Sequence, residues 1–276
     1  MLVSRWIYYL SSIPALLAGV KNGPRVARAL LDRSAPRPFM IELRSGPRFW
    51  VRSAMDIWIV KETCLDRQYE RASVPIQDGW TVVDIGAALG DFAISVARAR
   101  PASRVYAFEP FPDSYLLLQK NIAVNRVDNV FPSPYAIGGG DSQMRLAMTT
   151  AEAVQHTTVA GGATRGEHAS MQVSSMTLDR AIDVLGTSLP RCDYLKVDCE
   201  GGEYEIFFGA SEATLKSIRH ICLEYHDGVT PYSHDDLVRF FERHGFQVRC
   251  TPNRAHRHLG LLHARNTVFD GGYGQR

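Results

Sequence analysis

The sequence lacks the cysteine spacing of a metal or disulfide scaffold. Its five cysteines are scattered, and no two of them form a Cys-x-x-Cys pair. The spacing therefore indicates neither a zinc site nor a disulfide framework. Scattered thiols are typical of a reducing compartment, so we expect a cytoplasmic protein. A strong excess of one charge is also lacking, because the formal net charge is +2, and this predicts no nucleic-acid partner.

A long hydrophobic run is lacking as well. Residues 6–20, WIYYLSSIPALLAGV, carry no charge, but a helix that spans a bilayer needs about 20 apolar residues. Pro14 at the centre and the helix-like continuation KNGPRVARALLDR argue against a signal peptide. We expect residues 1–38 to form a helical segment packed on the rest of the chain. The alternative is peripheral membrane contact through residues 6–20.

Strand-like and helix-like segments alternate from Trp80 onward. The strand patterns are WTVVDI, RVYAFE, NVFPSP, CDYLKVD, IRHICLEYH, FQVRC and LGLLHAR. This alternation predicts an α/β fold, a doubly wound and mostly parallel seven-stranded sheet with helices on both faces. The last two strands have no helix between them, so we expect the last one to be antiparallel. The corresponding domain would comprise residues 39–276, with its core from about residue 78.

Other segments fill in this outline. Residues 39–53 read as a hairpin, residues 56–65 as one helix with Asp56 as its N-cap, and residues 203–216 as another single helix. Residues 143–148 and 171–176 read as paired strands. The intervening loop, 150–168, is long for a compact domain, so it is either a substrate-facing flap or a plain insertion. The sequence indicates no oligomeric state.

The stretch VVDIGAALGDFAIS, residues 82–95, ends a strand in a glycine turn. A dinucleotide fingerprint needs Gly-x-Gly-x-x-Gly, so that the backbone can approach a pyrophosphate. Here Gly86 and Gly90 are separated by three residues, and the methyl groups of Ala87 and Ala88 fill the turn. The turn therefore favours a nucleotide cofactor other than a dinucleotide.

Acidic residues around this turn indicate which cofactor it holds. Asp84 ends the strand and Asp91 opens the helix. These charges would repel a pyrophosphate but would face the sulfonium and ammonium groups of S-adenosylmethionine. Glu109, followed by Pro110, ends the next strand, where a carboxylate binds a ribose diol. The backbone of Ala136 and Ile137, after the third strand, is expected to line the adenine.

A second group of polar residues follows two later strands. They are Asp198, Glu200 and Glu203 after one strand, and Glu224 and His226 at the end of the next. Ligands bind at this edge of open sheets, and Asp198 is also expected to contact the cofactor. In one interpretation His226 is a general base oriented by Asp198 or Glu224, with Glu200 nearby. In a second, Asp198, Glu224 and His226 hold a divalent metal. In a third, the acids only cap helices and His226 lies in the wall.

The chain resembles the FkbM family of S-adenosylmethionine-dependent methyltransferases. The resemblance covers about residues 39–265 and is carried, beside the glycine turn, by MTLDRAI, CDYLKVDCEGGEYEIFFGA, ICLEYH and LGLLHAR. Asp91 stands where the family often has asparagine, and Cys199 where an apolar residue is more usual. The resemblance implies O-methylation of a hydroxyl on a sugar, glycan or polyketide-like natural product. The alternatives are N-methylation of an amino sugar or peptide, and a non-catalytic S-adenosylmethionine-binding protein.

Overall fold

The computed structural model describes residues 2–32, 38–141, 143–148, 156–158, 170–186, 190–253, 256 and 258–272. Seven strands form its central sheet: β3 (Thr81–Ile85), β4 (Arg104–Phe108), β5 (Val130–Ser133), β10 (Cys192–Val197), β11 (Ile218–His226), β12 (Phe246–Pro252) and β13 (Leu259–Asn266). Their order is β12-β13-β11-β10-β3-β4-β5. Strand β13 is antiparallel to both of its neighbours, and the other pairs are parallel. The predicted doubly wound sheet is confirmed.

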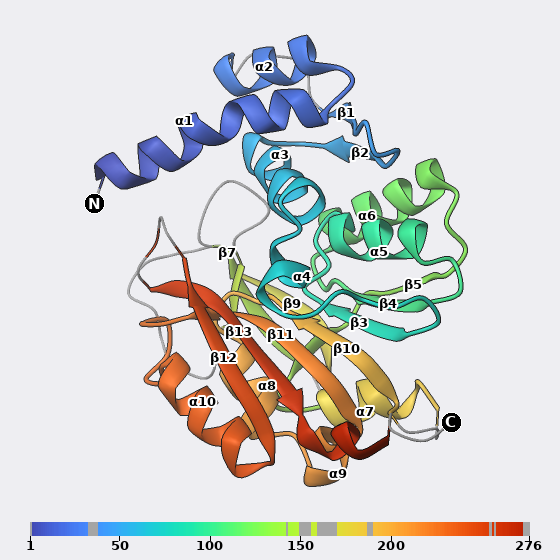
Figure 1. Cartoon of the computed structure of the whole chain (residues 1–276), viewed down its shortest axis with the longest axis vertical. Helices are drawn as coiled ribbons and strands as arrows, with labels where there is room; N and C mark the ends of the chain where they lie inside the picture. Colours follow the sequence, from blue (N-terminus) through green and yellow to red (C-terminus); the bar gives the residue numbers. More distant parts are fainter. Residues whose placement is uncertain are drawn as a thin grey trace.

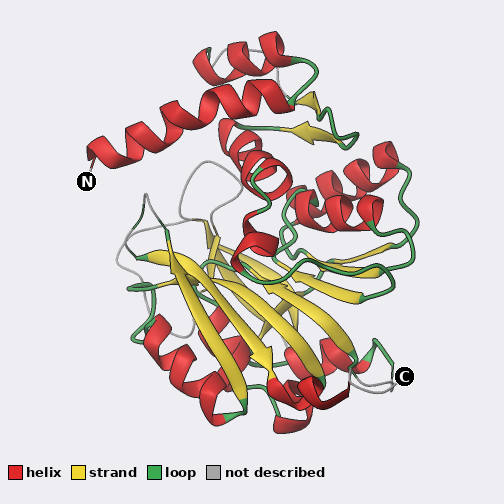
Figure 2. Ribbon diagram, in the orientation of Figure 1, coloured by secondary structure: helices red, strands yellow, loops and turns green. Residues whose placement is uncertain are grey.

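Helices cover both faces of this sheet (Figure 2). Those of the main domain are α4 (Gln68–Ala72), α5 (Asp91–Ala99), α6 (Pro112–Asn125), α7 (Leu178–Asp183), α8 (Glu203–Phe208), α9 (Glu212–Lys216), α10 (His234–Arg243) and the 3-10 turn η2 (Thr267–Gly272). Figure 1 shows α5 and α6 on one face and α7 to α10 on the other. The inner strands are buried on both faces, as in β10, where the consecutive residues Tyr194 and Leu195 are fully buried.

Two of the expected helices are interrupted. The segment 56–65 comprises α3 (Ala54–Val60) and a π-helical turn, η1 (Lys61–Leu65). Its N-cap is Ser53, which accepts a hydrogen bond from the backbone N–H of Asp56, so the prediction of Asp56 as N-cap was wrong. The predicted helix 203–216 is two helices, because α8 ends before Gly209 and Ser211 caps α9.

The N-terminal part forms a cap of two helices and a hairpin. Helices α1 (Leu2–Gly19) and α2 (Gly23–Leu31) precede the antiparallel strands β1 (Phe39–Glu42) and β2 (Arg48–Val51). Buried residues of all these elements share one apolar cluster with Leu89, Ile94 and Leu117 of the main domain. The hairpin is also fixed to α6, where Asn121 Oδ1 accepts a 2.7 Å hydrogen bond from the backbone N–H of Trp50. The expected helical pair is therefore present and docked.

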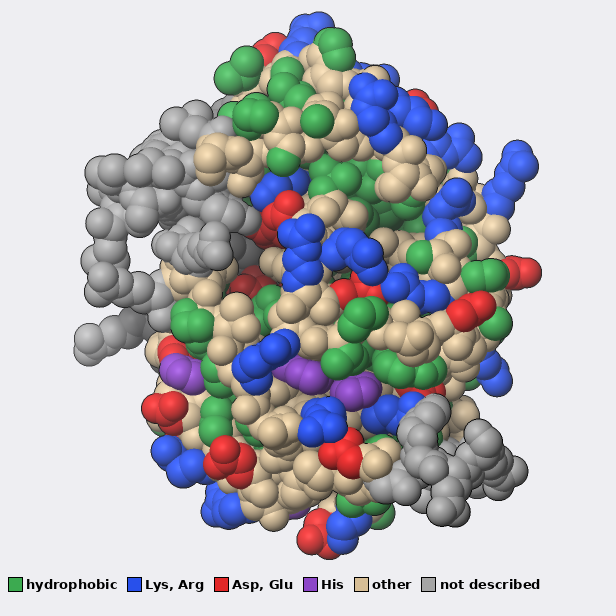
Figure 3. Space-filling view, viewed as in Figure 1, with side chains coloured by type: hydrophobic (Ala, Val, Ile, Leu, Met, Phe, Trp, Pro, Cys, Tyr) green, Lys and Arg blue, Asp and Glu red, His purple; other side chains and the backbone are tan. Residues whose placement is uncertain are grey.

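The surface of the cap bears on the membrane alternative. Among the described residues, none of the helices is long and apolar enough to cross a bilayer. On the face drawn in Figure 3, Lys and Arg side chains gather along the right-hand side of the upper half, over the cap and the helices beside it. Peripheral contact through residues 6–20 stays a prediction.

A smaller sheet is inserted between β5 and β10. Its strands are β6 (Ala136–Gly138), β7 (Gln143–Met148), β8 (His156–Thr158) and β9 (Ser170–Thr177), in the order β6-β9-β7-β8. Strands β7 and β9 pair antiparallel, which confirms the predicted pairing. Apart from β8, the loop 150–168 lies outside the described residues, so its role as a flap stays a prediction.

Candidate functional site

A cavity of about 550 Å³ opens at the carboxyl ends of the central strands. This volume is within the range of small-molecule sites. Residues at the ends of β3, β4, β10 and β11 form its floor, and β6 and β7 contribute Ile137 and Met144. The segment from α3 to α4 adds Met55, Glu62 and Tyr69. The segment from α3 to α4 therefore completes a pocket whose floor belongs to the sheet.

The glycine turn forms one part of this floor. Gly86 has a φ of +74°, and a Cβ at this position would lie 1.9 Å from the carbonyl oxygen of Asp198. A side chain is thus excluded here, because β3 and β10 approach each other closely. Ala88 also has a left-handed φ of 45°, and its backbone N–H points at Glu109 Oε2, 2.7 Å away. Asp91 opens α5 and lines the cavity.

Glu109 lies on the wall beside Pro110 and is 7% exposed. Its Oε1 accepts a 2.9 Å hydrogen bond from the backbone N–H of Phe111. Burial raises the pKa of Glu109 to about 7, although the N–H groups of Phe111 and Ala88 and the charge of Lys196 oppose this shift. Ala136 and Ile137 line the same cavity. The residues predicted for ribose and adenine are therefore brought together.

Three of the predicted cofactor residues lie behind the wall. Asp84, Ala87 and Gly90 are buried and do not line the cavity formed by the described residues. Asp84 is fully buried and forms an ion pair with Lys196, whose Nζ lies 2.9 Å from Asp84 Oδ1. The expectation that Asp84 faces the cations of the cofactor is therefore wrong, because the Asp84 carboxylate is buried and its charge is balanced by Lys196.

Lys196 was not singled out from the sequence. Its Nζ also donates a 2.8 Å hydrogen bond to the carbonyl oxygen of Gly86, so it holds the glycine turn. Burial alone would lower the pKa of Lys196, but the charges of Asp84, Asp198 and Asp91 raise it. A lysine between the apolar residues Leu195 and Val197 of a central strand was the available signal, because a buried charge needs a partner.

The second predicted group also meets in the cavity, since Asp198, Glu200, Glu224 and His226 all line its wall. The Tyr69 hydroxyl donates a 2.8 Å hydrogen bond to Asp198 Oδ2. Asp56, by contrast, is fully buried and accepts a hydrogen bond from the backbone N–H of Arg52. Asp56 therefore supports the cap, whereas Tyr69 reaches the site.

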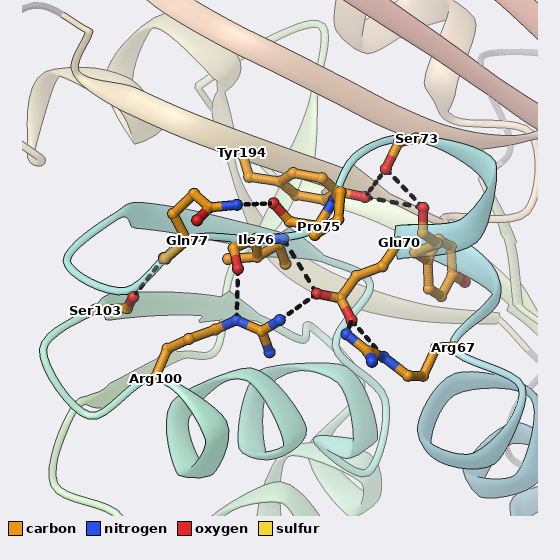
Figure 4. A network of polar contacts seen from close by, with 10 residues as sticks. Arg67, Glu70, Ser73, Pro75, Ile76, Gln77, Arg100, Ser103 and Tyr194 are labelled. Atoms are coloured by element: carbon orange, nitrogen blue, oxygen red, sulfur yellow. Dashed lines mark hydrogen bonds and ion pairs between the residues drawn. The ribbon is translucent and has the colours of Figure 1, made fainter.

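Helix α4, which carries Tyr69, is fixed by the polar network in Figure 4. Glu70 forms an ion pair with Arg100 at 2.5 Å and accepts a hydrogen bond from the backbone N–H of Ile76. The hydroxyl groups of Ser73 and Tyr194 lie 2.6 Å apart. The network joins α4 to α5 and β10, and it thereby fixes the tyrosine that contacts Asp198.

His226 is held by different acids from those expected. Its Nδ1 lies 3.2 Å from Glu203 Oε1, and its backbone N–H donates to the same oxygen at 2.8 Å. Its Nε2 lies 3.4 Å from Glu200 Oε2. The prediction that Asp198 or Glu224 orients the ring was therefore wrong. Glu203, in the first turn of α8, is fully buried, so it does more than cap a helix.

The charge of His226 follows from these neighbours. Burial alone would lower its pKa, but the hydrogen bond and charge of Glu203, together with Glu200 and Asp198, raise the pKa to about 10. These carboxylates favour the imidazolium form of the ring, and the role of His226 as a neutral general base stays a prediction. Burial raises the pKa of Glu200 to about 7, and it raises that of Glu224 well above the usual range.

The backbone beside this cluster has an unusual conformation. Glu200 has a φ of 50°, which is uncommon for a residue with a side chain, and Gly201 has a φ of 102°. Such residues are typical of functional sites, where the surrounding structure holds them. Here the backbone N–H of Gly201 donates a 2.8 Å hydrogen bond to Glu203 Oε2. The bend therefore turns the chain so that both Glu200 and Glu203 meet His226.

The fold and this site define an S-adenosylmethionine-dependent methyltransferase. Residues 84–248 match the methyltransferase FkbM domain. Because that match covers more than half of the chain, the protein belongs to the FkbM methyltransferase family.

Three curated relatives show the range of similar proteins. The chain is 27% identical over 206 residues to the hexuronic acid methyltransferase AglP of Haloferax volcanii, covering 73% of this chain and 80% of that one. It is 25% identical over 215 residues to the 31-O-demethyl-FK506 methyltransferase FkbM of Streptomyces tacrolimicus, covering 69% and 82%. It is 26% identical over 229 residues to the AMB antimetabolite synthetase AmbE of Pseudomonas aeruginosa, covering 69% of this chain but 10% of that protein's length.

Proposed function

We propose that the protein transfers the methyl group of S-adenosylmethionine to a hydroxyl of a sugar, glycan or polyketide-like natural product. One observation carries this proposal. The glycine turn with Glu109 and the cluster of Asp198, Glu200, Glu224 and His226 line one cavity at the carboxyl edge of the sheet. A cofactor and an acceptor that bind in the same cavity can meet directly. The names of two relatives, which act on a hexuronic acid and on demethyl-FK506, support this class of acceptor.

The cofactor would lie across the ends of β3 and β4. Glu109 would accept hydrogen bonds from the ribose hydroxyl groups, and Ala136 and Ile137 would contact the adenine. This placement points the methyl group toward the ends of β10 and β11. Positioning two reactants in this way is a large part of what a methyltransferase needs, because the sulfonium already activates the carbon.

The acceptor oxygen would attack the methyl carbon from the side of the polar cluster. As the new O–C bond forms, the C–S bond breaks and its electron pair stays on sulfur, which leaves the neutral thioether. The hydroxyl proton would pass to Glu200, because both ring nitrogens of His226 already face carboxylates. Glu200 lies on the cavity wall with its side chain 34% exposed, so an acceptor can approach it.

The alternatives differ in what the assay would show. An N-methyltransferase would modify amino sugars or peptides but not neutral sugars. A non-catalytic protein would bind S-adenosylmethionine without forming any product. The cluster of Asp198, Glu200, Glu224 and His226 favours catalysis, because a protein that only binds the cofactor does not need it.

The test is incubation with S-adenosylmethionine and pooled glycans, lipids and aminoglycosides. Mass spectrometry would detect products heavier by one CH₂ unit, and S-adenosylhomocysteine would be measured in parallel. We expect O-methylated products from wild type, and a loss of about 10²–10⁴ in rate from Glu200→Gln. The matched control is Glu212→Gln, whose side chain is 70% exposed on α9 and pairs with Lys216. Products methylated on nitrogen alone would contradict the proposal.

A further inference from the structure

Three potential ligand atoms converge on one corner of the cavity. Asp198, Glu224 and His226 each present one atom, and these three atoms lie within 4.8 Å of one another. The sheet register explains the convergence. Val197 of β10 pairs with Leu223 of β11, so the next residues, Asp198 and Glu224, follow side by side. His226 lies two residues beyond Glu224 in the same strand, and residues two apart in a strand share a face.

The histidine is held as a metal-ligating histidine would be. His226 is 5% exposed, and the fully buried Glu203 lies beside its Nδ1 at 3.2 Å. Glu203 also accepts the backbone N–H of His226 at 2.8 Å, so the carboxylate and the ring are fixed together. A carboxylate on one ring nitrogen sets the tautomer that leaves the other nitrogen for a metal. That other nitrogen, Nε2, lies 3.4 Å from Glu200 Oε2, so a cation bound there would take the place of its proton.

The two carboxylates complete the set. Tyr69 donates its hydrogen bond to Asp198 Oδ2, which orients this carboxylate and leaves Oδ1 for another partner. Glu224 lies on the cavity wall and has no hydrogen bond or ion pair with any residue in the described part of the chain. A carboxylate next to another carboxylate, without a donor of its own, is energetically costly unless it takes up a proton or a cation lies between the two.

We propose that Asp198, Glu224 and His226 bind a divalent cation, Mg²⁺ or Mn²⁺, at this corner of the cavity. Two carboxylate oxygens and one imidazole nitrogen are ligands that suit such ions. Once His226 has released its Nε2 proton, two carboxylates and an imidazole would match the charge of one dication. With only three protein ligands, such an ion would have further ligand positions for water or an acceptor hydroxyl.

The role of the ion, unlike its binding, rests on the proposed function. An acceptor hydroxyl in an open position would have its pKa lowered by the cation. Its O–H bond would break with the proton going to Glu200, and the oxygen would then form its bond to the methyl carbon as the C–S bond breaks. The electron pair of that bond would go to sulfur, so atoms and charges balance without another reactant.

Binding is tested with Mn²⁺ on the full chain, without cofactor or acceptor. The free Mn²⁺ signal in electron paramagnetic resonance is followed during titration. We expect one Mn²⁺ bound per wild-type chain, and competition by Mg²⁺. Glu224→Gln and Asp198→Asn are isosteric and should weaken binding at least tenfold. Glu203→Gln should weaken it about 10–100-fold, because Glu203 only orients the histidine. Glu212→Gln, on the exposed face of α9, should bind as wild type does.

Three results would overturn the inference. The first is no Mn²⁺ binding by the folded wild-type chain. The second is binding that Glu224→Gln and Asp198→Asn leave unchanged, with circular dichroism showing that both variants fold. The third is full methyl transfer after exhaustive chelation, which would leave the proposed function standing without an ion. If Mn²⁺ binds at the predicted residues but no acceptor is ever methylated, the proposed function fails and the site remains.

Discussion

The ion pair between Lys196 and Asp84 beneath the glycine turn leads to a quantitative prediction. The two side chains are 5% and 0% exposed, and their charged atoms lie 2.9 Å apart. Replacing one partner of such a pair leaves an uncompensated buried charge, which costs about 3–5 kcal/mol. Burial already raises the pKa of Asp84, so in Lys196→Met this carboxyl can take up a proton. We therefore expect a loss near the lower limit, about 3 kcal/mol of unfolding free energy.

The second partner gives the control. Asp84→Asn should also destabilise the protein, because it leaves the Lys196 ammonium buried beside the Gly86 carbonyl oxygen. The double variant replaces both charges. Its loss of unfolding free energy should be smaller than the sum of the two single losses, by a coupling energy of about 1–3 kcal/mol. Urea denaturation of all four proteins at pH 7 measures this cycle. Additive losses within about 0.5 kcal/mol would refute the assignment of this pair.

Three further predictions concern pH and the cap. The pKa of Glu109 near 7 predicts that affinity for S-adenosylmethionine falls about tenfold per pH unit below 7 by calorimetry; Glu109→Gln should bind more weakly and without this dependence. Burial lowers the pKa of His220 and of His263 to about 4, so the folded state excludes protons that the unfolded chain binds. Stability should fall as pH drops from about 6.5 to 4, less steeply in His263→Asn. Removing residues 1–35 should lower the melting temperature, because the cap shares an apolar cluster with the main domain; unchanged stability with higher solubility would favour a membrane anchor.

The sheet could be predicted because its central strands are buried on both faces and read as short apolar runs. WTVVDI and CDYLKVD are bounded by turns and followed by helix patterns, which is what parallel strands require. The site could be placed for the same reason, since residues that end neighbouring parallel strands meet at one edge. Glu109, Asp198 and His226 all follow this rule, and all line the cavity.

The partners within the site could not be predicted in the same way. Asp198, Glu200 and Glu203 follow one strand within six residues, and the chain path decides which of them meets His226. That path depends on the left-handed conformations of Glu200 and Gly201, which local propensity does not indicate for a glutamate. Acidic residues in the first turn of a helix are usually exposed and stabilise the helix end. For this reason the sequence did not reveal that Glu203 is buried against His226.

The wall that the segment from α3 to α4 contributes was also missed in part. The π-helical turn η1 places Glu62 and Thr63 toward the cavity. A π-helical turn adds a residue to one turn of a helix. The segment DIWIVKETCL is too short for this one extra residue to disturb its apolar spacing visibly, so the sequence reads as one regular helix. Such turns are frequent at functional sites, but periodicity alone does not reveal them.

In the proposed function, this cavity delivers a methyl group to a hydroxyl oxygen. The most direct test uses S-adenosylmethionine labelled with ¹³C in the methyl group, with product carbon shifts read by NMR. We expect a labelled O-methyl signal from wild type. We also expect Glu200→Gln to lose this signal while its affinity for S-adenosylmethionine, measured by calorimetry, stays within about twofold of wild type. A labelled N-methyl signal, or an undiminished O-methyl signal from Glu200→Gln, would contradict it.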